Sequence, residues 1–129
     1  MKKMFLIMMI ALFSLNMGIY AQQNAKAYDI VDVMPQFPGG MNAMMKFVSD
    51  NVKYPKEAEK KKLEGKSAIH FIVEKDGSIS NVSVKKSSHP ILDQEAMRVV
   101  KSMPKWIPGK LKGKAVRVKF IIPIAFRLN

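Results

Sequence analysis

The stretch VRVKFIIPIAFRL, residues 116–128, decides the fold because it carries the strongest strand pattern in the chain. Every even-numbered position in it is apolar: Val116, Val118, Phe120, Ile122, Ile124, Phe126 and Leu128. Strict alternation with a period of two predicts a β-strand that buries one face. Pro123 lies inside the pattern, although proline has no backbone N–H and is normally confined to edge strands or bulges. The stretch therefore predicts a long strand that carries the mark of a sheet edge.

Two further strands are predicted in the middle of the chain. Residues 67–74 and residues 79–86 are both rich in β-branched residues, and an Asp-Gly pair, which favours a tight hairpin turn, stands between them. Ile79 is out of phase with the valines that follow it, so we expect a β-bulge near Ser80. These two runs therefore predict an antiparallel hairpin.

Three helices are predicted around these strands. Apolar residues recur at helical spacing over residues 41–52, and the methionines among them are expected to fill the core. Pro55 suits the first turn of a second, short helix, and Gly65 suits its end. Residues 92–103 have the spacing of a third helix. A hairpin with a late third strand, and helices that cover one face, make a small α+β domain.

The chain offers no set of residues for catalysis or for binding a metal. It has no cysteine, which excludes disulfides, thiolate ligands and cysteine nucleophiles. Its two histidines, His70 and His89, are too few for a histidine-rich metal site. Asp93 and Glu95 are two positions apart on a predicted helix, so their side chains point to different faces and do not form a catalytic pair. The sequence predicts neither an enzyme nor a bound cofactor.

The N-terminus, MKKMFLIMMIALFSLNMGIYAQQ, has the layout of a secretory signal peptide, with two lysines, an apolar run and a small residue at Ala21. We predict cleavage after Ala21, which removes residues 1–21 and leaves residues 22–34 as a polar leader. The alternative is an uncleaved anchor, because residues 4–21 reach the lower length limit for spanning a bilayer. In both cases the rest of the chain is exported.

The charge balance is strongly basic, with a formal net charge of +12 that falls to +10 once the two lysines of residues 1–21 are removed. A nucleic-acid partner is not expected, because the chain is exported and its lysines are dispersed without interleaved aromatic residues. The simplest interpretation is a solvated basic surface, which would also favour contact with anionic polymers of the cell envelope.

Four segments together carry a resemblance to a known family: MPQFPGG (residues 34–40), YPKEAEKKKLEGK (54–66), FIVEKDGSISNVSV (71–84) and the long run from LDQEA to PIAF (92–126). In this order they resemble the C-terminal domain of TonB proteins, and in particular short TonB-like proteins that carry MPQFPGG before the first helix. The similarity runs over about residues 32–128, and the domain is expected to occupy residues 35–129.

The resemblance implies a fold and a function. The family's fold is a three-stranded antiparallel sheet packed against two main helices, here with an extra N-terminal helix. Its last strand lies at an edge and accepts the TonB box, an extended segment of an outer-membrane transporter, by β-strand addition. The family transduces energy from inner-membrane proton-channel partners to the transporter. A periplasmic location is implied, or the periplasmic side of the inner membrane if the anchor is retained.

The resemblance also implies the residues that bind the partner. Carried over by position they are Asn51, Ala115, Val116, Arg117, Val118, Lys119, Phe120, Ile121 and Ile122. By alternation Arg117 and Lys119 point away from the core face, where they are expected to meet acidic residues that flank the incoming segment.

The chain departs from a full TonB protein in its linker. Only 12 residues lie between Ala21 and Met34, none of them proline, and they reach about 40 Å when extended at roughly 3.5 Å per residue. Two functions therefore stay open. The first is a periplasmic binding module for transporter segments. The second is a structural envelope protein that holds peptidoglycan or another anionic polymer through its basic surface.

Overall fold

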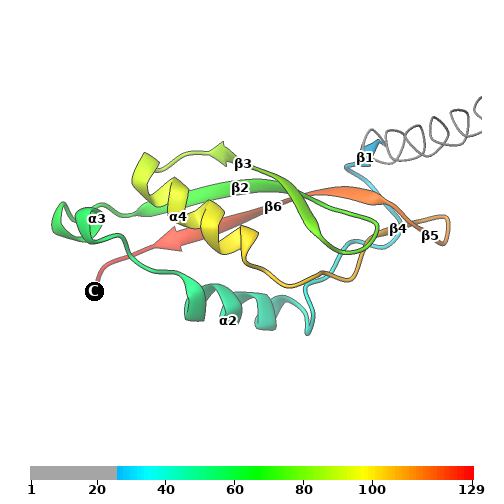
Figure 1. The fold of residues 1–129 in the computed structure, drawn as a ribbon, viewed down its shortest axis with the longest axis horizontal. Coiled ribbons are helices and arrows are strands. Elements are labelled where there is room, and N and C mark those ends of the chain that lie inside the picture. The colour runs from blue at the N-terminus through cyan, green and yellow to red at the C-terminus, as the bar shows by residue number, and fades with distance from the viewer. Residues whose placement is uncertain (1–25) are drawn as a thin grey trace, which may run out of the picture.

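The computed structural model describes residues 26–129 of the chain (Figure 1). The predicted signal peptide or anchor, and the cleavage point after Ala21, lie outside the described residues. The elements follow in the order β1 (Ala27–Tyr28), α2 (Met41–Asn51), α3 (Lys56–Lys60), β2 (Gly65–Val73), β3 (Ile79–Lys86), α4 (Pro90–Lys101), β4 (Lys110–Leu111), β5 (Lys114–Ala115) and β6 (Arg117–Phe126).

The main sheet has the strand order β1-β6-β2-β3. β2 pairs antiparallel with β3 on one side and with β6 on the other, which confirms the predicted three-stranded antiparallel sheet. The sheet also has a fourth, two-residue strand that the sequence did not predict. β1 runs parallel to β6, with Ala27 opposite Arg117 and Tyr28 opposite Val118.

The core lies between the sheet and the helices α4 and α2, and Figure 1 shows α4 crossing one face of the sheet. The alternation in the last strand decides which of its side chains face this core, as predicted. Val118, Ile122, Ile124 and Phe126 of β6 are buried, whereas Lys119, Ile121, Pro123 and Ala125 are exposed on the other face. Because antiparallel sheets tolerate one solvated face, β6 can be apolar on one side only.

The methionines of α2 do not all fill the core, which corrects the sequence-based expectation. Met44 is buried, but Met41 and Met45 are more than 60% exposed. α2 contacts the core through a stripe that includes Met44 and Phe47. Each residue turns a helix by about 100°, so Met45 is rotated away from the side that Met44 occupies.

The hairpin β2–β3 contains the predicted bulge. His70 lies opposite Ser83 and Ile72 lies opposite Ser80, so the register shifts between these pairs, and Asn81 has a φ of 51°. The end of α3 differs from the prediction, because the backbone turns at Lys62, with a φ of 54°, and Gly65 already begins β2.

The segment before β6 contains the short hairpin β4–β5. Its turn places Lys112 and Gly113 at φ values of 51° and 77°. A lysine rarely adopts this left-handed conformation, which is why the sequence carried no hairpin signal there. Trp106, upstream of this hairpin, is 4% exposed and packs in the core.

Among residues 26–129 there is no helix long and apolar enough to cross a membrane.

Candidate functional site

The candidate site is the side of β6 that faces away from β2. On the β2 side the pairing is continuous, from Val118 opposite Val73 to Phe126 opposite Gly65. On the other side the described residues supply only β1, which reaches Arg117 and Val118. Residues 119–126 therefore have no strand partner on this side within the described part of the chain. We call this stretch the open edge.

Pro123 lies within the open edge and does not interrupt the sheet. The pairing with β2 continues through Pro123, which lies opposite Ala68, to Ile124, Ala125 and Phe126 without a register shift. The regular pairing of β6 with β2 therefore does not end at Pro123. A proline is tolerated in a strand where its nitrogen faces the unpaired side of the sheet. The row of N–H donors along the open edge is accordingly interrupted at Pro123.

The first residues of the predicted site are already engaged within the chain. Ala115 pairs with Lys110 in the β4–β5 hairpin, and the Val116 N–H donates a hydrogen bond to the Gly109 carbonyl oxygen at 3.1 Å. Of the predicted contact residues, those on the open edge are Lys119, Phe120, Ile121 and Ile122.

Arg117 contacts an acidic residue of this chain. Its guanidinium donates two hydrogen bonds to the Glu74 carboxylate, with Nε–Oε1 at 2.7 Å and Nη2–Oε2 at 3.1 Å. Burial opposes the ionisation of Glu74, but the hydrogen bonds from Arg117 and Ser80 outweigh it and lower the pKa of the carboxyl group. The hydrogen bond to Glu74 raises the pKa of Arg117 against the effect of burial. A two-pronged pair of this kind fixes the direction of the guanidinium.

Lys119 also has an acidic neighbour in this chain, but a looser one. Its Nζ lies 3.8 Å from Oδ2 of Asp29, one residue after β1, and both side chains are well exposed. We expected acidic residues of a partner to contact these two basic side chains. Within the chain, Glu74 contacts Arg117 and Asp29 lies near Lys119.

A hollow of about 470 Å³ lies where residues 26–29 leave β6. It is lined by Asp29, Met34, His70, Lys85, Lys119, Phe120 and Ile121. The lining combines charged groups with apolar side chains, and it extends from the first residues of the open edge to His70 of β2 and Lys85 of β3. An extended segment laid along this edge would direct side chains into the hollow.

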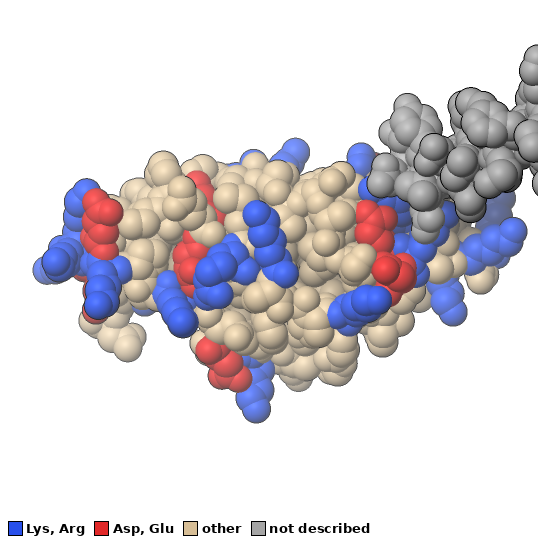
Figure 2. Space-filling model, viewed as in Figure 1, with Lys and Arg blue, Asp and Glu red and all other residues tan. Residues whose placement is uncertain are grey.

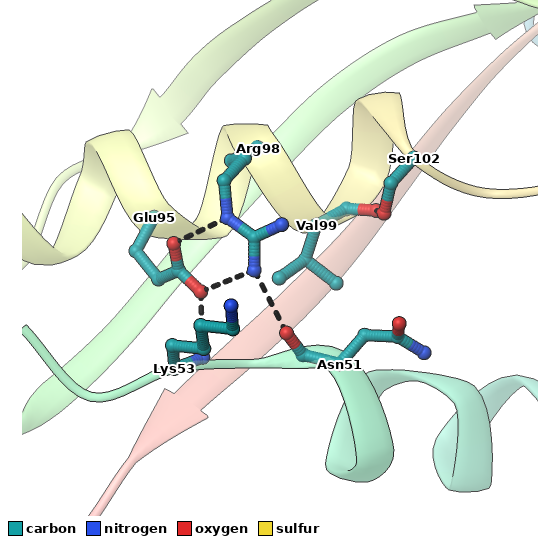
Figure 3. A network of polar contacts seen from close by, with 6 residues as sticks. All are labelled: Asn51, Lys53, Glu95, Arg98, Val99 and Ser102. Atoms are coloured by element: carbon teal, nitrogen blue, oxygen red, sulfur yellow. Dashed lines mark hydrogen bonds and ion pairs between the residues drawn. The ribbon is translucent and has the colours of Figure 1, made fainter.

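Asn51 lies in a different part of the molecule. Its carbonyl oxygen accepts a hydrogen bond from Arg98 Nη2 at 2.8 Å (Figure 3). Its Nδ2 donates to the Phe47 carbonyl oxygen at 2.7 Å. Three residues later the ring of Tyr54 packs against Phe126, the last residue of β6, with centroids 5.8 Å apart. The structure thus places Asn51 towards the C-terminal end of β6, away from β1.

Glu95 joins the end of α2 to α4 (Figure 3). It accepts hydrogen bonds from Arg98 Nε at 2.7 Å and from the Lys53 N–H at 2.6 Å. Burial raises the pKa of Glu95, but the bonds from Arg98 and Lys53 lower it further than burial raises it. Glu95 thus pairs with Arg98 across one turn of α4, and Arg98 in turn holds the Asn51 carbonyl in place.

The sequence did not reveal the contribution of residues 26–29 to this site. A two-residue strand is too short for a periodic pattern, and Asp29 stands in a leader without other structural signals. The described residues contain no group of three or more histidine, aspartate or glutamate side chains that could hold a metal ion.

Three comparisons with known proteins bear on this geometry. The family model described as the C-terminal of the Gram-negative bacterial TonB protein matches residues 50–128. An NMR solution structure of the Helicobacter pylori TonB C-terminal domain is 29% identical, with a TM-score of 0.55, over 71% of this chain and 87% of that one. A shorter version of the same domain is 28% identical, with a TM-score of 0.51, over 66% and 89%. The comparison with curated proteins found no significant match.

Proposed function

Because the chain belongs to the family of TonB C-terminal domains, we propose that it is a periplasmic module that binds the TonB box of outer-membrane transporters by strand addition. The observation that carries this proposal is the open edge of β6, residues 119–126. An exposed edge is a hazard that proteins usually cover, so an edge left open over eight residues calls for a partner.

The chemistry of strand addition fits this edge. Main-chain hydrogen bonds supply the attraction, and alternate side chains choose the partner. The exposed side chains of Lys119 and Ile121 and the hollow beside them are the features that a bound segment would contact. Binding at this place needs no catalytic group, and the proposal assigns the protein none.

A titration followed by NMR tests the proposal. The processed protein is purified from the cells that produce it. It is then titrated with peptides from the periplasmic N-termini of those cells' transporters. We expect shifts concentrated in residues 119–122 of β6. Absence of shifts at millimolar peptide, with the fold intact, would contradict the proposal.

Two variants of one residue sharpen this test. Alternate N–H groups of a strand point to the same side, so the Ile121 N–H faces the open edge as the Pro123 nitrogen does. Ile121→Pro removes that donor without touching the pairing with β2, and we expect it to weaken peptide binding about tenfold, the loss of one hydrogen bond. Ile121→Val keeps the donor and should bind within about twofold of the original chain.

A second function is favoured by one observation, the exposed lysines Lys110, Lys112 and Lys114 of the β4–β5 hairpin. Such a cluster suits an anionic envelope polymer such as peptidoglycan. On the face drawn in Figure 2, however, basic residues are interspersed with acidic ones and form no single broad patch. Binding to purified cell wall that weakens as salt is added, together with a failed peptide titration, would support this second function.

A further inference from the structure

The N-terminal segment, residues 26–29, lies beside the first residues of β6. It is on the same side of that strand as the open edge. Ala27 and Tyr28 pair in parallel with Arg117 and Val118, and Asp29 approaches Lys119. A strand laid on this side of β6 is what the proposed function requires of a partner. Here the chain itself supplies the first two residues of such a strand.

We propose that the N-terminal segment is a built-in competitor, which a partner's extended segment displaces when it pairs with β6 as far back as Arg117. The inference rests on the proposed function, since it concerns access to the same edge. A partner that pairs only with residues 119–126 binds beside β1, whereas a longer one must remove β1 first.

Among residues 26–129, few contacts hold the N-terminal segment. The pairing covers two residues, and Ala27 and Tyr28 are only half-buried. The ion pair between Asp29 and Lys119 spans 3.8 Å between side chains that are 75% and 42% exposed, and exposed pairs of this kind contribute little. The segment can therefore leave β6 without disturbing the core.

The chain that follows is held much more firmly. Val33 and Lys110 exchange two backbone hydrogen bonds, at 3.0 and 2.8 Å, and Gln36 and Ile107 do the same. Phe37 is buried in the core. Between these anchors and β1 lies Ile30, which is 84% exposed. The segment is thus loosely bound and joined to these anchors by a short tether, which keeps its local concentration at β6 high.

The charges indicate what a displacing segment carries. Arg117 is already engaged by Glu74 in a two-pronged pair. Lys119 is bound only loosely by Asp29, so an acidic residue of the partner can take over its ammonium group. The partner is therefore an extended segment that runs parallel to β6, as β1 does, with an acidic residue at the level of Lys119.

Paired variants of the processed protein test the proposal. Ala27→Pro/Tyr28→Pro removes both backbone N–H donors of β1, so the segment loses its donor to β6 whichever of the two residues faces that strand. Ala27→Val/Tyr28→Val keeps both donors and serves as the matched control. The probe is a synthetic peptide of this chain's own residues 24–30, and the readouts are amide shifts and amide hydrogen exchange along β6.

In the double-proline variant we expect faster amide exchange at residues 117–119. We also expect binding of the peptide at millimolar concentration, about tenfold tighter than in the double-valine control, because the tethered competitor is gone. Equal exchange in the two variants, equal binding, or no binding to the double-proline variant would each overturn the proposal. The probe is a peptide of this chain and not of a transporter, so the outcome of this experiment does not depend on the transporter titration. The two proposals can therefore fail separately.

Discussion

Asp93 joins three segments of the chain through one buried carboxylate. It lies in the first turn of α4 and is 6% exposed. Its Oδ1 accepts hydrogen bonds from Ser67 Oγ of β2 at 2.6 Å and from the Ser88 N–H at 3.1 Å, and its Oδ2 accepts one from Ser87 Oγ. The negative charge also suits the N-terminal end of a helix.

The pKa of Asp93 follows from these contacts. Burial alone would raise it, but the hydrogen bonds from Ser67, Ser87 and the Ser88 N–H lower it below its usual value. A carboxyl group whose pKa is depressed on folding contributes stability above its unfolded pKa of about 3.9, and that stability is lost as the pH falls through the folded pKa.

We predict that Asp93→Asn lowers the free energy of unfolding by about 1–3 kcal/mol at pH 7, because hydrogen bonds to a charged group are lost. The difference from the original chain should stay constant above about pH 4 and shrink as the pH falls below the unfolded pKa of about 3.9, through the lower folded pKa, since the original chain loses its advantage there. Urea unfolding at several pH values measures both effects. Asp50→Asn, at an exposed position of α2, is the control and should cost less than about 0.5 kcal/mol. A difference that stays constant with pH would contradict the assignment.

At the scale of the element, Pro123 is the main irregularity of β6. It interrupts the donors of the open edge, so we predict that Pro123→Val raises self-association through that edge. Sedimentation measures the change. Ala125→Val adds a β-branched side chain on the same exposed face without restoring a donor, and it should stay as monomeric as the original chain. An unchanged monomer for Pro123→Val would refute this role.

The β2–β3 turn is fastened to the loop that carries Trp106. The Trp106 N–H donates to the Gly77 carbonyl oxygen at 2.8 Å, and a Cβ on Gly77 would stand 2.0 Å from the Trp106 carbonyl oxygen. Gly77 also has a φ of 89°, which L-residues rarely adopt. The turn and the loop can approach this closely only because residue 77 has no side chain.

We predict that Gly77→Ala costs about 2–4 kcal/mol of unfolding free energy, from the left-handed backbone together with the clash. Gly113→Ala is the matched control, because Gly113 has a φ of 77° but open space around it. It should cost only about 1–2 kcal/mol, from the backbone alone. Chemical denaturation of both variants measures the difference, and equal losses would show that the contact with Trp106 does not matter.

At the scale of the whole molecule, an aromatic cluster connects the N-terminal part to the sheet. Phe37 packs against Phe47 of α2 and Trp106, with centroids 5.6 and 5.8 Å apart, and Trp106 in turn packs against Phe71 of β2 and Phe120 of β6. Phe37 lies upstream of residue 50, where the family match begins. The folded unit is therefore expected to include the residues before that match.

We predict that Phe37→Ala destabilises the whole domain by about 3–5 kcal/mol, the usual cost of removing a buried phenylalanine ring. The loss should appear as a single cooperative transition at lower denaturant when tryptophan fluorescence of Trp106 is followed. Met41→Ala, at a 63% exposed position nearby, should change stability by less than about 0.5 kcal/mol. An equally small effect for Phe37→Ala would place residues 35–49 outside the cooperative unit.

The local elements could be predicted because their signals lie within a few neighbouring residues. The alternation in β6 and the helical spacing of α4 follow which side of the backbone is buried, and that leaves a period in the sequence. The Asp-Gly pair marks its turn because these residues suit the backbone conformation of a tight hairpin. The helical pattern wrongly predicted that Met41 and Met45 are buried. Such a pattern shows which side of a helix is apolar, but it does not show how much of that side the neighbouring elements cover. Periodic patterns also missed the β4–β5 turn, where a lysine adopts a conformation typical of glycine.

The sequence by itself determined the α+β class, the three main strands and the edge position of the last one, since Pro123 and the alternation around it restrict where that strand can lie. Only the tertiary structure decided which part of the edge is open. β1 pairs with β6, and Arg117 pairs with Glu74, 43 positions away. Contacts between such distant residues leave no periodic trace, because they depend on how the complete fold brings the two backbones together.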